Sequence, residues 1–222
     1  MEYIYTTDPT DVIDYIYNQL VEHLEKDEAV VWLVSGGSAI DTAVAISDRL
    51  SEYDITKLSV SLVDERFGAV GHENENWQQL LDKGFNLPTS ELHRPLIGQD
   101  RATTSEAFGE WLKDRLSEAD YSIGLFGIGS DGHTAGIKPG SPAVQAEGWT
   151  ADYTWKDFER ITMTFNAIRK LDLAVLQVNG DNKFPTLHQL LNETVSLDTQ
   201  PAQIFKELKK SILFTDYKEE NS

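Results

Sequence analysis

A histidine stands in a glycine-rich segment near the middle of the chain. The segment Gly127–Ala135 reads Gly-Ile-Gly-Ser-Asp-Gly-His-Thr-Ala and places Asp131 two residues before His133. A histidine side chain titrates near neutral pH, so His133 is suited to accept a proton from water or a hydroxyl group. Asp131 can orient the ring or bind a substrate hydroxyl. The alternative explanation of the same pattern is an exposed histidine in a glycine turn.

The glycines of this segment also match the dinucleotide fingerprint Gly-x-Gly-x-x-Gly. That fingerprint opens a long helix, whereas the residues that follow here are interrupted by Gly136, Pro139, Gly140 and Pro142. The glycines therefore predict a loop that presents Asp131 and His133, and not a dinucleotide site.

The segment Ser35-Gly36-Gly37-Ser38 is a candidate anion-binding turn. It lies between a predicted strand and a predicted helix. Glycines let the backbone approach a phosphate closely, and the N–H groups at a helix N-terminus favour an anion. Ser38 would cap the helix or bind a phosphate oxygen. The Gly-Lys-Ser/Thr ending of a nucleotide P-loop is missing, and a tight turn with a serine cap explains the segment equally well.

Several cations accompany these segments. Asp64-Glu65-Arg66 follows a predicted strand, and the Arg66 guanidinium can hold a phosphate through two hydrogen bonds. Arg160 opens another predicted strand, Lys183 follows a third, and Lys138 lies near the histidine. Taken singly, each of these residues is more typical of an ordinary surface charge or ion pair.

Alternating strands and helices must position these residues. Apolar runs and strand-like alternation predict strands at about 29–34, 58–63, 123–126, 160–165, 173–178 and 212–214. Helical spacing predicts helices at about 9–26, 40–50, 77–81, 105–116, 183–191 and 203–210. This order indicates an α/β fold with a mostly parallel sheet covered by helices on both faces. The loops that begin at Ser35, Asp64 and Gly127 leave the carboxyl ends of predicted strands, so we expect them to converge at one edge.

The composition excludes several classes of partner and chemistry. The 19 Lys and Arg against 37 Asp and Glu give a net charge of −18, which disfavours nucleic acid and anionic membranes. The absence of cysteine excludes disulfides and thiol nucleophiles, and His23, His72, His93 and His188 show no metal-ligand spacing. No apolar run approaches the ~20 residues of a membrane helix, and the acidic N-terminus is no secretory signal. A cytoplasmic location is therefore expected.

Together these residues resemble the family of 6-phosphogluconolactonases and glucosamine-6-phosphate deaminases. The histidine loop with Pro139-Gly140 is the specific part of the resemblance. Order and approximate spacing match from about residue 28 to Asp216, with support from the turn at 35–38, Asp64–Arg66, Asn76, Arg160-Ile-Thr-Met-Thr and Gly180-x-x-Lys183. The resemblance implies a Rossmann-like three-layer α/β sandwich and a single sugar-phosphate lactonase/isomerase-like domain over residues 1–222.

The implied reaction is the hydrolysis of 6-phospho-D-glucono-1,5-lactone to 6-phospho-D-gluconate in the oxidative pentose phosphate pathway. The family requires neither metal nor cofactor, and the expected protein is a monomer or small homo-oligomer whose partner is a phosphorylated sugar lactone. By position, His133 is the general base, with Asp131 beside it. The expected substrate- and phosphate-binding residues are Gly36, Gly37, Ser38, Asp64, Arg66, Arg160 and Lys183.

The chain departs from the family pattern at three places. Gly136-Ile137-Lys138 replaces the usual Ser-Leu-Phe, Phe67–Val70 replaces the usual Val-Pro, and Glu75 replaces the Ser before Asn76. These changes bear on the choice of substrate more than on the fold. Lys138 adds a cation near the histidine, which would help an oxyanion or lower the pKa of the imidazole.

Two alternatives to the lactonase remain open. Deaminase relatives carry Ile after the histidine and Glu before Pro-Gly, where this chain has Thr134 and Lys138. Both differences favour the lactonase. A non-catalytic sugar-phosphate-binding protein on the same fold is the other alternative, but binding alone would not require a titratable base such as His133 beside Asp131.

Overall fold

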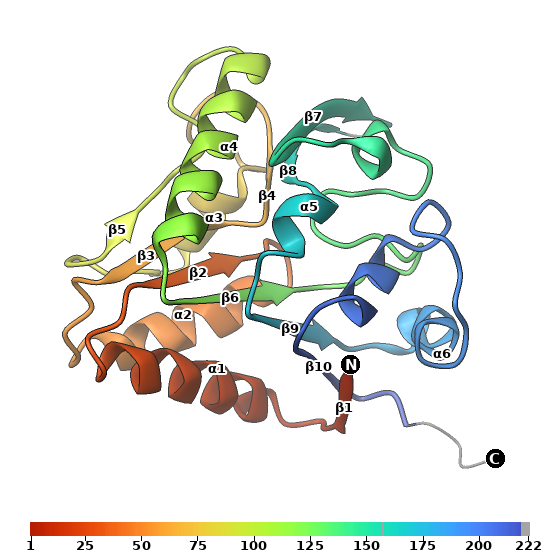
Figure 1. Cartoon of the computed structure of the whole chain (residues 1–222), viewed down its shortest axis with the longest axis horizontal. Helices are drawn as coiled ribbons and strands as arrows, with labels where there is room; N and C mark the ends of the chain where they lie inside the picture. Colours follow the sequence, from red (N-terminus) through yellow and green to blue (C-terminus); the bar gives the residue numbers. More distant parts are fainter. Residues whose placement is uncertain (157, 219–222) are drawn as a thin grey trace.

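A seven-stranded parallel sheet forms the centre of the molecule (Figure 1). The computed structural model describes residues 1–156 and 158–218. Neighbouring strands are all parallel. Their order is β1 (Glu2–Tyr5), β10 (Ser211–Thr215), β9 (Leu173–Val178), β6 (Tyr121–Phe126), β2 (Val30–Val34), β3 (Leu58–Leu62) and β5 (Glu91–Leu92).

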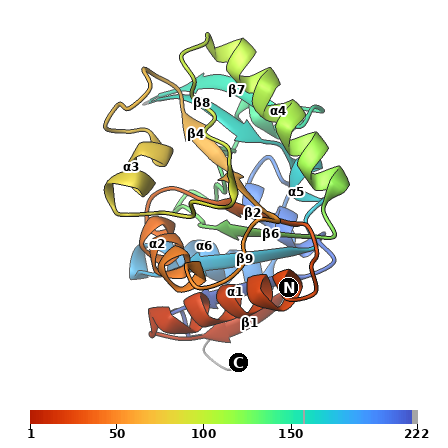
Figure 2. The same ribbon diagram turned by 90° about the vertical axis from the view of Figure 1, so that its left-hand side faces the viewer.

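Helices cover both faces of this sheet (Figure 2). One core is shared with α1 (Pro9–Leu24), α2 (Ala39–Leu50) and α3 (Asn76–Asp82). The other is shared with α4 (Arg101–Glu118), α5 (Phe165–Ile168) and α6 (Phe184–Asn192). Successive side chains of a strand point to opposite faces of the sheet, so each strand contributes side chains to both cores.

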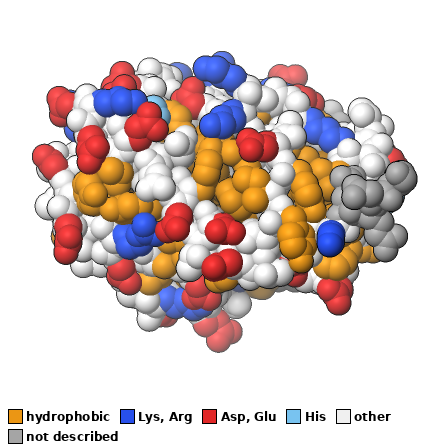
Figure 3. All heavy atoms as spheres, turned by 90° about the horizontal axis from the view of Figure 1, so that it is seen from below, with side chains coloured by type: hydrophobic (Ala, Val, Ile, Leu, Met, Phe, Trp, Pro, Cys, Tyr) orange, Lys and Arg blue, Asp and Glu red, His pale blue; other side chains and the backbone are white. Residues whose placement is uncertain are grey.

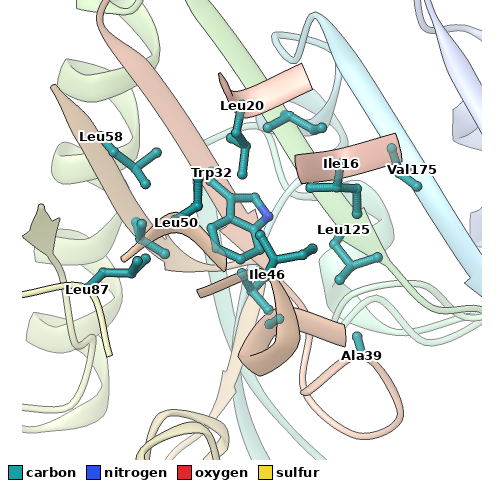
Figure 4. Packing of buried hydrophobic residues seen from close by; sticks show 14 of the residues in the cluster. Ile16, Leu20, Trp32, Ala39, Ile46, Leu50, Leu58, Leu87, Leu125 and Val175 are labelled. Carbon is teal, nitrogen blue, oxygen red and sulfur yellow. The ribbon is translucent and has the colours of Figure 1, made fainter. Parts of the chain in front are cut away.

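Strand β2 shows this alternation. Val30, Trp32 and Val34 belong to the core beneath α1 and α2, and Val31 and Leu33 belong to the core beneath α4. All five residues of the strand are buried. Figure 4 shows the Trp32 indole packed among side chains from both helices, including Ile16, Leu20 and Ile46. A strand with two apolar faces has a continuous apolar sequence, which is why the pattern at 29–34 predicts it.

The surface carries the polar and charged residues that the helices turn away from the sheet. Asp8 accepts a hydrogen bond from the backbone N–H of Thr10 and caps α1, and Asp100 caps α4 through the N–H of Thr103. Acidic side chains are spread between apolar patches and a few cations on the face shown in Figure 3. Within the described ranges, no helix is both long and apolar enough to cross a membrane.

A small antiparallel sheet is built beside the main one. Its strands lie in the order β4 (Asp64–Arg66), β8 (Phe158–Met163) and β7 (Thr150–Trp155). Strand β4 follows β3 after the single residue Val63, whose N–H donates to Val34 O and whose carbonyl accepts from Met163 N. Val63 is therefore the point at which the chain leaves the parallel sheet and enters the second one.

The predicted α/β fold with a parallel sheet covered on both faces is confirmed. Two local predictions are wrong. Asp64–Arg66 forms strand β4 rather than a loop. The helix predicted at 203–210 is a 3-10 helix, η3 (Pro201–Lys206), and residues 207–210 are turns and bends, because the chain must enter β10 at Ser211. The helix predicted at 183–191 is α6 (Phe184–Asn192), which follows a 3-10 turn, η2 (Asp181–Lys183).

Sequence patterns missed the short or polar elements. Strands β1, β5 and β7, helix α5 and the 3-10 turn η1 (Pro142–Gln145) were not predicted. Strand β5 has only two residues, both exposed, and β7 buries only Tyr153. Neither presents an apolar alternation that the sequence could reveal.

Candidate active site

A pocket of about 230 Å³ lies at the carboxyl edge of the parallel sheet. The segments that follow β2 and β6 contribute to it, together with β4, β8 and the residues around Lys183. Its lining residues are Ser35, Gly36, Gly37, Ser38, Asp64, Arg66, Asn76, Gly127, Ile128, Gly129, His133, Ala135, Arg160 and Lys183. The segments at 35, 64 and 127 therefore converge, as expected from the parallel topology.

The pocket contains nearly all the residues singled out from the sequence. His133 lines it together with Gly36, Gly37, Ser38, Asp64, Arg66, Arg160 and Lys183. Asp131 does not line the pocket, but its Oδ1 is hydrogen-bonded to His133 Nδ1.

The histidine side chain is held between two charges of its own loop. Asp131 Oδ1 also accepts the backbone N–H of His133 at 3.2 Å. Lys138 Nζ lies 2.9 Å from His133 Nδ1 and 3.4 Å from Nε2. Partial burial raises the pKa of Asp131, but the hydrogen bond and charge of His133, with help from Lys138, lower it below its ordinary value overall. Asp131 is thus a carboxylate at neutral pH.

Glycine is required where the loop passes the imidazole. A Cβ atom on Gly129 would lie 2.0 Å from His133 Nδ1 and 2.7 Å from Asp131 Oδ1. Only a residue without a side chain lets the backbone come this close. Gly129 is therefore explained by the packing of the loop against its own histidine.

The small antiparallel sheet holds this loop in place. Thr134 Oγ1 donates to Gly127 O at 3.0 Å, and Gly136 N donates to Thr162 Oγ1 of β8 at 3.0 Å. The hydroxyl of Tyr153 in β7 donates to the carbonyl of Gly136. These bonds fix the position of His133 relative to Arg160, which lies two residues before Thr162 in β8.

Two arginines of the pocket come from adjacent strands. Arg66 and Arg160 are partners in the register of β4 and β8. Both guanidinium groups lie over the ring of Phe158, at 4.8 Å and 5.4 Å from its centroid. Lys183 adds a third cation, and burial lowers the pKa of its ammonium from the ordinary value. The arrangement gathers positive charge inside a strongly acidic chain.

Asp64 and Glu65 are buried carboxyl groups beside these cations. Burial raises the pKa of Asp64, and the nearby charges of Arg160, His133 and Arg66 oppose that rise. Burial also raises the pKa of Glu65 to about 8, although the hydrogen bonds that its carboxylate accepts from three backbone N–H groups oppose the change. Those donors are Arg66 N, Asn76 N and Trp77 N, so Glu65 ties β4 to the start of α3.

Asn76 is a pocket residue that was not among the predicted site residues. Its side chain is 2% exposed, and its Nδ2 donates to Asp64 O at 3.0 Å. A Cβ atom on Gly36 would lie 2.1 Å from Asn76 Oδ1, so Gly36 permits this contact. The only sequence signal for Asn76 was its position shortly after Asp64–Arg66.

The turn before α2 keeps its donors available. Ser38 occupies the N-cap position of α2, but its side chain makes no capping hydrogen bond, so its hydroxyl is not used as a cap. Gly37 has a φ of 64°, which favours glycine. Among the hydrogen bonds of the described residues, none uses the N–H groups of Gly36, Gly37 or Ser38. Such a turn at a helix N-terminus suits an anion.

The fold and the pocket define an α/β protein with a cation-lined site at the carboxyl edge of its parallel sheet. Among the described residues, no cluster of three or more side chains of the types His, Cys, Asp and Glu is arranged to hold a metal ion. The chain belongs to the glucosamine-6-phosphate isomerase/6-phosphogluconolactonase family, which it matches over residues 9–214. The predicted family resemblance is thereby confirmed.

Individual relatives span the whole chain. A 6-phosphogluconolactonase from Borreliella burgdorferi is 25% identical over 235 aligned residues, which cover 100% of this chain and 98% of the relative. The crystal structure of a 6-phosphogluconolactonase from Shewanella baltica has a TM-score of 0.80 at 17% identity and covers 97% of each chain. A monomeric glucosamine-6-phosphate deaminase has the same TM-score of 0.80 at 19% identity and the same coverage. The two structures show that the fold is shared.

Proposed function

We propose that this protein hydrolyses 6-phospho-D-glucono-1,5-lactone to 6-phospho-D-gluconate, the second step of the oxidative pentose phosphate pathway. The observation that carries the proposal is the placement of the His133–Asp131 pair at a pocket that also contains Arg66, Arg160 and Lys183. Full-length relatives named 6-phosphogluconolactonase support it. A phosphorylated lactone needs both parts of this site, since one end is an anion and the other an activated ester.

The phosphate is assigned to the cationic end of the pocket. At the start of α2, the unpaired N–H groups of Gly36, Gly37 and Ser38 would donate hydrogen bonds to the phosphate. Arg160 and Lys183 add charge, and Arg66 offers a planar fork of donors. This cluster overcomes the repulsion expected between a phosphate dianion and a chain of net charge −18.

The hydrolysis is assigned to His133. Asp131 engages Nδ1, so Nε2 is the ring nitrogen that accepts the proton of a water molecule. The water oxygen forms a bond to C1, and the resulting oxyanion is stabilised by N–H groups of the glycine loop or a nearby cation. The bond between C1 and the ring oxygen then breaks, and the imidazolium returns its proton to that oxygen. Water is the only co-reactant.

A glucosamine-6-phosphate deaminase is the second candidate, because its fold is shared and the family includes both activities. The charges around His133 disfavour it. Lys138 lies against the imidazole, and the ammonium group of an amino sugar bound there would be repelled. A neutral lactone that develops negative charge during hydrolysis is attracted instead.

The test is hydrolysis of freshly made 6-phosphogluconolactone above the spontaneous rate, with His133→Ala and His133→Asn beside the wild type. We expect both variants to lower kcat by a factor of about 10²–10⁴, because they remove the general base. The exposed His188→Asn is the matched control and keeps full activity. A folded wild type that gives no acceleration would contradict the proposal. Ammonia release from glucosamine 6-phosphate, or phosphosugar binding without turnover, would then identify the deaminase or the binding protein.

A further inference from the structure

Lys138 makes contacts that the proposed reaction does not yet use. Its Nζ lies 2.9 Å and 3.4 Å from the two ring nitrogens of His133 and 3.4 Å from Asp131 Oδ2. The Lys138 side chain is only 14% exposed. A long cationic side chain held this closely against one imidazole is not an ordinary surface lysine.

The backbone places Lys138 there. Thr134 and Ile137 pair across a tight turn, with Ile137 N donating to Thr134 O at 2.9 Å. Ile137 is buried in the core, and the N–H of Lys138 donates to the hydroxyl of Tyr153 at 3.3 Å. The turn therefore folds the chain back so that Lys138 meets the histidine four positions after the turn begins.

Asp131 and Lys138 act on the imidazole in opposite directions. A carboxylate in contact with the ring favours the imidazolium form, and an ammonium in contact disfavours it. A general base must be unprotonated before it accepts a proton from water. It must also release that proton readily to the leaving ring oxygen. Asp131 alone would favour the protonated ring. That would leave less of the unprotonated base and would slow the return of the proton to the ring oxygen.

Other elements around the pocket also present charges to His133. Strand β4 contributes Asp64 and Arg66, β8 contributes Arg160, and the turn before α6 contributes Lys183. Asp64 opposes the cations, and the three cations line the end assigned to phosphate. A bound phosphate dianion offsets two of those three positive charges. Lys138 is the cation that touches the ring itself.

We propose that Lys138 is a positioning residue for the hydrolysis: its ammonium balances Asp131 and keeps His133 in the unprotonated form that accepts a proton from water. The inference rests on the proposed function for its role in turnover, but the charge balance on His133 exists without substrate. The competing explanation is that Lys138 only stabilises the loop through its ion pair with Asp131.

The experiment compares Lys138→Met, which removes the charge and keeps the length, with Lys138→Arg, which keeps the charge. Lys113→Met on the exposed face of α4 is the matched control for loss of one positive charge. The first readout is the pH profile of kcat/KM for lactone hydrolysis. We expect the acid limb to move to higher pH by about one unit in Lys138→Met and to stay near the wild-type position in Lys138→Arg and Lys113→Met.

The second readout does not depend on turnover. The ring signals of His133, assigned by their loss in His133→Asn, are followed by NMR as a function of pH in the ligand-free protein. We expect them to titrate at higher pH in Lys138→Met than in the wild type. This shift without any lactonase activity would support the charge balance while contradicting the proposed function. Unshifted His133 signals, or a uniform fall of kcat/KM at every pH, would overturn the role of Lys138.

Discussion

Arg66 and Arg160 stand directly opposite each other in the antiparallel pair of β4 and β8, although both carry a positive charge. Like charges at such positions repel and destabilise a sheet. The ring of Phe158, two residues before Arg160, lies beneath both guanidinium groups and attracts them through its electron-rich face. The two strands thus hold two cations that repel each other side by side. An anion bound between them would relieve that repulsion.

Replacing Phe158 with Leu should weaken anion binding more than turnover. The two cation–π contacts, of roughly 0.5–1 kcal/mol each, hold the arginines in place before an anion binds, so their loss should weaken binding by up to about 5- to 30-fold. Titration calorimetry with inorganic phosphate measures the affinity, and steady-state kinetics give KM and kcat. Phe158→Tyr, which keeps the ring, should restore the affinity. Equal phosphate affinity in Phe158→Leu and the wild type would show that the ring does not position the arginines.

Gly129→Ala should strongly lower kcat and leave the fold intact. The added methyl group would lie 2.0 Å from His133 Nδ1, so the imidazole must move away. A displacement of about 1 Å costs on the order of 100-fold in kcat. Gly148→Ala is the control, because its Cβ would meet no atom closer than 3.4 Å. Circular dichroism and the melting temperature check folding, and retained activity in Gly129→Ala would refute the close packing of loop and ring.

The free energy of unfolding should depend on pH through Glu65. Burial raises its pKa from 4.5 to about 8, so between these values the folded protein holds a proton that the unfolded chain has released. Stability from this group is present at low pH and falls as pH rises through that window, by up to roughly 4–5 kcal/mol. Urea unfolding from pH 5 to 8.5 measures the slope. Glu65→Gln should flatten it, whereas the exposed Glu106→Gln should not; parallel slopes in all three proteins would contradict this account.

His93 should make the free energy of unfolding fall as the pH drops, the opposite of the effect of Glu65. Its ring stacks on Trp111 with centroids 4.6 Å apart, and burial lowers its pKa to about 4. Below pH 6.5 the unfolded chain gains a proton that the folded protein resists, so stability falls by about 3 kcal/mol as pH drops from 6.5 to 4. His93→Phe keeps the stacking and should lack this loss in urea unfolding. An unchanged acid slope in that variant, relative to His188→Phe, would argue against a neutral buried His93.

The central strands and the position of the pocket could be predicted from the sequence because they follow simple patterns. A run such as Val30–Val34 is apolar at every position, as burial on two faces requires. Parallel strands bring their carboxyl ends to one edge, which places the segments at 35 and 127 together without any knowledge of contacts. These regularities are local in sequence or general to the topology.

The second sheet and its consequences could not be predicted in this way. Asp64–Arg66 and Thr150–Trp155 are polar, and only their pairing with β8 makes them strands. The stacking of Phe158 and the contact of Lys138 with His133 depend on side chains that meet after the chain has changed sheets. Asn76 occupies the pocket because Glu65 ties the start of α3 to β4. No hydrophobic period encodes such contacts.

The change of sheets at Val63 also governs how this protein can lose its activity. The pocket needs residues from Ser35 to Lys183, and β7 and β8 hold the histidine loop through Tyr153 and Thr162. The strands of the parallel sheet pair with one another and not with the hairpin, whose Ile161 and Met163 are nevertheless buried in the core beneath α4. Opening of the hairpin would therefore remove the site and uncover part of that core, while the paired parallel strands would keep their protection from hydrogen exchange. Inactivation on mild heating should precede global unfolding, and during refolding the site should be the last part of the molecule to assemble.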